Sequence, residues 1–418
     1  MASSLPKHYE TTLKNGLQVV VIPMRNGSGV ITTDIFYKVG SRNEVMGKSG
    51  IAHMLEHLNF KSTKHLKAGE FDKIVKSFGG VDNASTGFDY THYFIKSSAK
   101  NLDRSLWLFS ELMANLKLDE KEFLTEREVV AEERRWRVDN NPTGYLYFRL
   151  FNNTFIYHPY HWTPIGFMQD ILHWTIEDIR SFHKTYYQPK NAIIVVAGDI
   201  DPKEVFETAK KHFESIPNCC EIPKVHQVEP PQDGAKRIEI KRDSEVEMIA
   251  ITFHIPNFAH EDQVALSAIS ELLSSGKSSR LYKRLVDEKK MVNQIYAYNM
   301  ETKDPGVFLF LAVANPGVKA EEIEKEIWEQ IEALKEGKIE KEELEKIKIN
   351  TKADFVFGLE NSSNVADLFG SFLAKGDLEP LLHYEENIDK LTTKVLREAA
   401  KRYFTKRNST TVILRKDD

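Results

Sequence analysis

Cysteine, long apolar runs and an excess of charge of one sign are scarce in this 418-residue chain. The only cysteines, Cys219 and Cys220, are adjacent, so they cannot join distant segments and no structural disulfide within the chain is expected. Their place in a polar linker favours plain thiols over a metal-binding pair. No run of about 18 apolar residues occurs, so no transmembrane helix is expected. The net charge of −5 is too small to attract nucleic acid or a membrane surface.

The first residues, Met-Ala-Ser-Ser-Leu-Pro-Lys, lack the apolar core of a signal peptide. We expect a cytoplasmic location from this, with a periplasmic or secreted location as the alternative if a leader has been removed. Hydrophobic residues make up 41% and charged residues 28% of the chain, as in ordinary globular proteins. The length favours two or three domains over one.

Residues 53–57, His-Met-Leu-Glu-His, carry the strongest indication of chemistry. Residues four apart lie one above the other on a helix, so His53 and His57 can direct two imidazoles at one metal ion. Glu56 can then reach a water on that ion without being a ligand. This H-x-x-E-H pattern is the inverted form of the zincin motif, and imidazoles suit zinc. A pair of surface histidines on an amphipathic helix is the alternative.

A zinc site with two imidazoles needs a third protein ligand, often a carboxylate. Residues 119–138 contain neither Gly nor Pro and are dense in Glu and Arg, which predicts a helix. Glu126 and Glu133 are seven positions apart, so two helical turns place them on nearly the same face. Composition leaves open which carboxylate points inward, and a solvated face of ion pairs is the alternative for most of these charges.

The two segments together resemble a known family. Residues 126–133 read Glu-Arg-Glu-Val-Val-Ala-Glu-Glu. The pitrilysin and mitochondrial-processing-peptidase family of zinc peptidases, the inverzincins, carries H-x-x-E-H followed by E-R-x-V-V-x-x-E, whose last Glu binds zinc. The chain is most similar to the bacterial processing-peptidase-like type. The resemblance implies a Zn²⁺ cofactor.

The same resemblance implies a role for each residue of the site. His53, His57 and Glu133 would be the metal ligands. Glu56 would be the general base, and Glu126 an accessory residue that supports a ligand. Glu132 is the nearest competitor of Glu133, since an alignment error of one residue would select it.

Residues 79–93, GGVDNASTGFDYTHY, resemble the family's strand G-G-x-x-N-A-x-T-x-x-D-x-T-x-Y. In the family this strand lies at the edge of a sheet and pairs with the substrate backbone. The resemblance therefore implies Asn83 and Ala84 as substrate-binding positions. An ordinary hairpin strand is the alternative. His158-Pro159-Tyr160 and Ile165-Gly166 resemble a further landmark of the family.

The chain contains an internal repeat. Residues 175–196 align without gaps on residues 392–413, with matched pairs such as Thr175/Thr392 and Asn191/Asn408. Each copy predicts a helix, a polar turn and a strand, and two copies indicate a duplicated domain. We expect an α+β fold of two homologous domains, each a mostly antiparallel sheet covered by helices.

The domains are predicted at residues 1–217, which carry the metal motif, and 237–418, which carry no H-x-x-E-H and would form a wall of the substrate chamber. A Pro-rich polar segment at 218–236 would be the linker. The expected strands are 17–23, 30–38, 192–197, 237–242 and 247–255, and the expected helices after the linker are 262–274, 319–335 and 340–356.

One segment departs from the family. Active members also use an Arg and a Tyr from the second copy, in a segment resembling L-R-E-K-x-G-L-A-Y. Residues 285–293 align with it, and Val286 and Asn293 stand at the Arg and Tyr positions. Some bacterial relatives divide the site between two chains. We therefore expect a heterodimer with a homologous chain that lacks H-x-x-E-H, and a homodimer is the alternative.

These observations predict a zinc metalloendopeptidase that hydrolyses peptides or unfolded polypeptides through a metal-activated water. A non-catalytic subunit that binds polypeptides or serves as a scaffold in a larger complex is the alternative.

Overall fold

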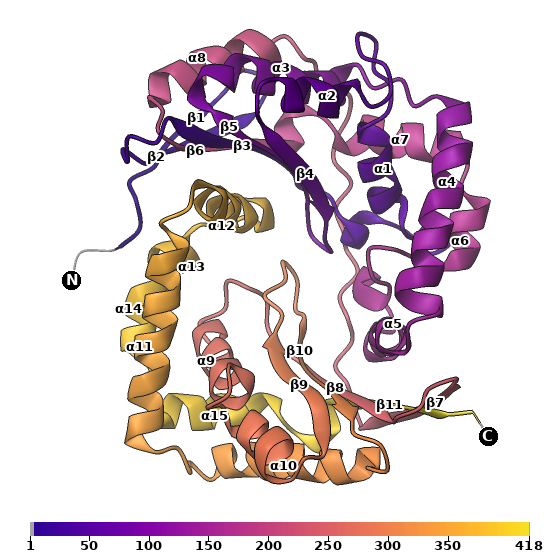
Figure 1. The fold of residues 1–418 in the computed structure, drawn as a ribbon, viewed down its shortest axis with the longest axis vertical. Helices are drawn as coiled ribbons and strands as arrows, with labels where there is room; N and C mark the ends of the chain where they lie inside the picture. The colour runs from indigo at the N-terminus through magenta and orange to yellow at the C-terminus, as the bar shows by residue number, and fades with distance from the viewer. Residues whose placement is uncertain (1–3, 418) are drawn as a thin grey trace. The chain divides into compact units, whose positions relative to one another are not determined.

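The computed structural model describes residues 4–417, which form two compact units (Figure 1). The first unit contains the described residues up to Glu133 together with Trp162–His226 and Val356–Leu381. The second contains Arg134–His161, Gln227–Phe355 and the described residues from Leu382 onward. No helix within 4–417 is long and apolar enough to cross a membrane.

A six-stranded sheet in the order β1-β2-β6-β3-β5-β4 is the centre of the first unit. Its neighbouring strands are antiparallel except for the parallel pair β2 and β6. Aliphatic residues such as Ile31 and Ile35 point from one face into a single buried core. The strands are β1 (Tyr9–Thr12), β2 (Gln18–Pro23), β3 (Val30–Tyr37), β4 (Val81–Thr86), β5 (Thr91–Ser98) and β6 (Ala192–Gly198).

Helices cover both faces of this sheet. The core face carries most of the helices of the first half, and α12 (Ser362–Lys375) lies against the opposite face, over β3 and β6 (Figure 1). The other helices of this unit are α1 (Ile51–Asn59), α2 (Glu70–Ser77), α3 (Leu102–Ala114), α4 (Glu120–Arg134), α6 (Met168–His173), α7 (Ile176–Tyr186) and α8 (Pro202–Phe213).

The second unit contains a five-stranded sheet in the order β7-β11-β8-β10-β9, in which only β7 and β11 are parallel. Its strands are β7 (Lys236–Arg242), β8 (Met248–His254), β9 (Val292–Asn299), β10 (Val307–Ala314) and β11 (Ser409–Lys416). Its helices are α5 (Pro142–Thr154), α9 (Gln263–Ser274), α10 (Ala320–Lys335), most of α11 (Lys341–Gly358), α14 (Tyr384–Asp389) and α15 (Thr393–Tyr403), whereas α13 (Glu379–Leu382) lies mainly in the first unit.

The two sheets share one topology, since β2-β6-β3-β5-β4 and β7-β11-β8-β10-β9 follow the same order and the same sense of pairing. The repeat recurs in atomic detail. Thr175 caps α7 and Thr392 caps α15 through side-chain oxygens. The Asn191 amide donates to the Tyr186 carbonyl at 2.9 Å, and the Asn408 amide donates to the Tyr403 carbonyl at 2.8 Å. The predicted α+β fold with two sheets covered by helices is confirmed.

The compact units differ from contiguous domains at 1–217 and 237–418, because each half of the chain contributes a helix to the other sheet. Helix α5 from the first half packs on β8 and β11, and α12 from the second half packs on β3 and β6. Thr154 on α5 bonds Thr252 on β8 at 2.7 Å between hydroxyl oxygens. Periodicity shows that a helix has an apolar face but not which sheet covers it. The described segment 214–235 contains no helix or strand, and the linker at 218–236 stays a prediction.

Candidate metal centre

Helix α1 presents the H-x-x-E-H motif on one face. Ile51, Met54, Leu55 and Leu58 are buried in the core, as their helical spacing predicted. His53, Glu56 and His57 lie on the remaining face and are partly exposed. The ring centroids of His53 and His57 are 4.7 Å apart and the rings are nearly perpendicular.

The start of α1 is fixed by close backbone packing. Gly50 has φ +86°, and a Cβ there would lie 2.7 Å from the carbonyl oxygen of Ile165. Gly166 faces it with φ +76°, and its Cβ would lie 2.7 Å from the nitrogen of Gly50. Both positions therefore require glycine.

The carboxylate of Glu44 caps α1 in the absence of a capping side chain at Gly50. It accepts hydrogen bonds from the N–H groups of Gly50 and Ala52 and from the Trp162 indole, each at 2.8 Å. Burial raises the pKa of Glu44 to about 8, although these three donors act in the opposite direction.

Helix α4 brings a carboxylate to the two imidazoles. Oε2 of Glu133 lies 3.6 Å from Nε2 of His53 and 3.3 Å from Nε2 of His57. Glu132 is exposed and is not part of the cluster. Among residues 4–417, His53, His57 and Glu133 are the only group of three His, Cys, Asp or Glu side chains placed to share an ion, and we call them the HHE triad.

The spacing of the HHE triad fits a zinc ion. Bonds of about 2.05 Å at tetrahedral angles separate neighbouring ligand atoms by about 3.3 Å. The two measured separations are 3.3 and 3.6 Å, and all three donor atoms lie within 4.8 Å of one another. Two imidazoles and a carboxylate are also a donor set of catalytic zinc sites, which leave one position open.

Glu126 and Lys61 support the triad from behind His57. Oε1 of Glu126 accepts from Nδ1 of His57 at 2.9 Å, and its other oxygen pairs with Nζ of Lys61 at 2.6 Å. Burial opposes the charged imidazole, but the bonds to Glu126 and Glu133 prevail and raise the pKa of His57 to about 9. Burial likewise favours a protonated Glu126, yet His57 and Lys61 hold the pKa of that carboxyl below its ordinary value.

Glu56 lies beside the triad and is oriented from the sheet. The hydroxyl of Thr86 donates to Oε2 of Glu56 at 2.5 Å. Thr86 ends β4, the edge strand of its sheet in the described structure. Asn83 and Ala84 lie in the middle of β4, where Asn83 pairs with Phe94 on β5. The predicted substrate positions and the predicted base therefore belong to adjoining elements.

Comparison with known proteins identifies the family. Residues 19–161 match the family model described as insulinase (peptidase family M16), and residues 173–351 match the one described as the peptidase M16 inactive domain. The zinc protease PqqE of Helicobacter pylori is 58% identical over 99% of this chain and 94% of its own length. The chain belongs to peptidase family M16. The resemblance inferred from the motifs is thereby confirmed.

Two solved structures share the fold, and a more distant curated relative matches in sequence. A crystal structure of a protease from Helicobacter pylori matches with a TM-score of 0.97 at 58% identity, over 98% of this chain and 100% of that one. An M16 inactive-domain structure from Pseudomonas fluorescens matches with a TM-score of 0.85 at 16% identity, covering 99% and 98% of the two chains. A probable mitochondrial-processing peptidase subunit beta of Arabidopsis thaliana is 25% identical over 96% of this chain and 77% of its own.

Sequence reasoning did not single out Thr86, Lys61 or Glu44. Thr86 occupies the first Thr position of the strand motif and shares a face of β4 with Ala84, so alternation along the strand was the available signal. Lys61 follows His57 by four residues, but it lies beyond the end of α1 at Asn59. For Glu44 there was no signal, because it reaches α1 from a loop.

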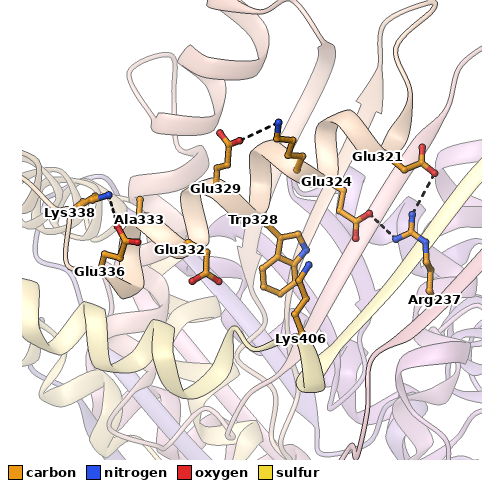
Figure 2. A pocket seen from close by; sticks show the side chains of 11 residues that line it. Arg237, Glu321, Glu324, Trp328, Glu329, Glu332, Ala333, Glu336, Lys338 and Lys406 are labelled. Atoms are coloured by element: carbon orange, nitrogen blue, oxygen red, sulfur yellow. Dashed lines mark hydrogen bonds and ion pairs between the residues drawn. The ribbon is translucent and has the colours of Figure 1, made fainter.

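The second unit has a cavity of about 720 Å³ along α10, shown in Figure 2. Its floor is Trp328, with Nζ of Lys406 3.5 Å from the ring centroid. Arg237 pairs with Glu324 at 2.7 Å. Acidic and basic side chains alternate along this cavity, and none of its lining residues belongs to the HHE triad.

Proposed function

We propose that this chain is a zinc metalloendopeptidase that hydrolyses peptides or unfolded polypeptides, with His53, His57 and Glu133 as the zinc ligands. The observation that carries the proposal is the convergence of three donor atoms within 4.8 Å beside an edge strand. The zinc-protease names of relatives that cover nearly the whole chain agree with it.

The bound zinc would supply an activated water and polarise the scissile carbonyl. Glu56 would accept the proton of the attacking water and deliver it to the leaving amine. Thr86 would hold one oxygen of Glu56 and leave the other for the water. Glu126 would keep Nδ1 of His57 protonated, so that Nε2 faces the metal.

The substrate would bind as an added strand on β4. An edge strand offers unpaired N–H and C=O groups to an extended chain, whatever its side chains. Asn83 and Ala84 lie on this strand, whose end bonds Glu56. Such recognition suits an unfolded polypeptide better than a folded protein, because only an extended backbone can join the sheet.

The Glu56→Gln variant tests the assigned base. Elemental analysis should find stoichiometric zinc in this variant. Its kcat on an unstructured peptide should fall by about 10²–10⁴-fold. Glu132→Gln is the matched control, because it makes the same replacement of a carboxylate by an amide at an exposed position next to a proposed ligand. This variant should hydrolyse the peptide at the wild-type rate. Turnover at the wild-type rate by Glu56→Gln would refute the assignment.

We further propose that this chain is the metal-bearing subunit of a heterodimer. Val286 and the exposed Asn293 at the start of β9 stand where family members carry Arg and Tyr, and a homologous partner without H-x-x-E-H would supply that pair. Side chains that contact the developing oxyanion can be worth several kcal/mol in such reactions.

Peptide hydrolysis by the pure chain, alone and mixed with such a homologous chain, tests the divided site. The mixture should be active and the chain alone nearly inactive. Full activity of the isolated chain would defeat the divided site while leaving the zinc assignment intact. Peptide binding without hydrolysis in both samples would favour the non-catalytic, polypeptide-binding subunit.

A further inference from the structure

The two cysteines are held side by side at the start of the linker. Successive side chains of an extended strand point in opposite directions. Here the backbone bends, and Sγ of Cys219 lies 2.7 Å from Sγ of Cys220. This separation is only about 0.65 Å longer than a disulfide bond of about 2.05 Å. Both side chains are exposed, so small reagents can reach them.

Gln188 fixes this bent dipeptide with both ends of its amide. Its Oε1 accepts from the N–H of Cys219 at 3.0 Å, and its Nε2 donates to the carbonyl of Cys220 at 3.1 Å. Gln188 is itself only 2% exposed, so the amide is a rigid anchor.

The residues on either side of the cysteines are also tied to the first unit. Asn218 accepts from the N–H of Lys190 and donates to the carbonyl of Asn15. Nζ of Lys190 pairs with Glu221 at 3.2 Å. The dipeptide is therefore held from both directions along the chain, unlike a pair of cysteines in a free loop.

The two thiols interact with each other. The Cys219 thiol donates to Sγ of Cys220, and this bond raises the pKa of Cys219. The ammonium groups of Lys184 and Lys190 act in the opposite direction on Cys219, and they favour negative charge at this place.

We propose that Cys219 and Cys220 form a vicinal dithiol that a hydroperoxide oxidises to a cyclic disulfide. The thiolate of one cysteine attacks the peroxide oxygen, the O–O bond breaks, and the alcohol or water leaves with a proton, which gives a sulfenic acid. The thiol of the other cysteine then attacks that sulfur, and the S–O bond breaks with loss of water. In sum two thiols lose two electrons and two protons, and one hydroperoxide is reduced.

The ring should be easily reduced again. Consecutive Cα atoms are about 3.8 Å apart across a trans peptide, whereas ordinary disulfides join Cα atoms about 4.4–6.8 Å apart. A disulfide between neighbours is therefore strained, and strained, exposed disulfides are the labile ones. The site is a reversible modification site and not a structural crosslink.

Peroxide treatment of the reduced full-length protein, followed by peptide mapping by mass spectrometry, tests the proposal. The peptide that contains both cysteines should become lighter by two hydrogen atoms and recover its mass with excess glutathione. Cys219→Ser and Cys220→Ser are matched controls, because each keeps one exposed thiol and should gain oxygen or link two chains. Sulfinic acid or interchain disulfides as the wild-type products would overturn the proposal.

Phenylarsine oxide gives a second measurement without an oxidant, since a trivalent arsenical binds firmly only to two neighbouring thiols. The reduced wild type should bind it stoichiometrically and resist removal by a monothiol. Each serine variant should lose it under the same wash. Equal retention by the wild type and the variants would show that the two sulfurs do not act as a pair.

Discussion

The imidazole of His57 lies between two carboxylates, Glu126 on Nδ1 and Glu133 on Nε2. Without a metal this arrangement favours the imidazolium, which explains the raised pKa. A metal ion bound here would take the place of the proton on Nε2, and the bond to Glu126 would remain. In the proposed site Glu126 would therefore act on the metal through His57, while Lys61 pairs with the other oxygen of Glu126.

The Glu126→Gln variant should weaken metal binding without removing a ligand. The amide keeps the shape but loses the charge that orients and polarises His57, so zinc affinity should fall about 10–100-fold. Competition with a chromophoric chelator measures this. Glu128→Gln on the exposed side of α4 is the control and should bind zinc as the wild type does. Equal affinities for both variants would contradict the role given to Glu126.

At the scale of elements, α1 depends on Glu44 for its N-terminal hydrogen bonds. Folding holds the pKa of Glu44 near 8, above its ordinary value of 4.5. The folded state therefore keeps a proton that the unfolded chain releases. Stability from this group is complete below about pH 4.5 and is lost as the pH rises through about 8.

The Glu44→Gln variant should remove this part of the pH dependence. Urea denaturation between about pH 5 and 8 measures the unfolding free energy of the wild type and of the variant. As the pH rises, the wild type should lose stability relative to the variant. The comparison cancels the contribution of His57, which titrates in both proteins. A difference that stays constant over this range would show that Glu44 does not hold its proton in the fold.

The contact of α12 with β3 depends on a glycine in the helix. A Cβ on Gly370 would lie 2.0 Å from Cε2 of Phe36, which is fully buried. Gly370→Ala should therefore destabilise the protein by about 1–3 kcal/mol, although alanine favours helices. Gly358→Ala near the end of α11 meets no atom within 4 Å and should be neutral or stabilising. Thermal denaturation compares the two, and equal stability would mean that α12 does not pack as described.

At the scale of the molecule, neither half of the chain supplies all the helices that cover its own sheet. Helix α12 covers the face of β3 that contains Phe36, and Thr32 bonds Ser362 at 2.8 Å between hydroxyl oxygens. A chain cut before α12 would expose this face, including the buried Asp34 and His92 pair.

Residues 1–217 expressed alone should aggregate or unfold without cooperativity, and should not hold stoichiometric zinc. The reason is that they contain every residue of the HHE triad but lack the helix that covers the sheet. Expression together with residues 218–418 should restore a soluble, zinc-loaded complex. Gel filtration and elemental analysis make the comparison. Cooperative unfolding and full zinc content of 1–217 alone would show that the exchange of helices is dispensable.

Much of the fold was predictable because its signals are local. The predicted strand at 30–38 corresponds to β3, and the predicted helices at 262–274 and 319–335 correspond to α9 and α10. The predicted helix at 119–138 is α-helical only to Arg134 and continues as a π-helix over Arg135–Asp139. The π-helix has no periodic signature of its own in so short a segment.

Sequence alone determined that His53, Glu56 and His57 share a face, since helical spacing fixes neighbours within one element. It also determined the repeat and several strands of each sheet, but not β1, β9 or β10. Only the tertiary structure decided that Glu133, and not Glu132, meets the imidazoles. It also decided that Thr86 bonds Glu56 and that Lys61 pairs with Glu126. The same holds for α5 and α12, each of which packs on the sheet formed by the other half of the chain. Those outcomes depend on how separate elements pack, and packing depends on the whole folded chain.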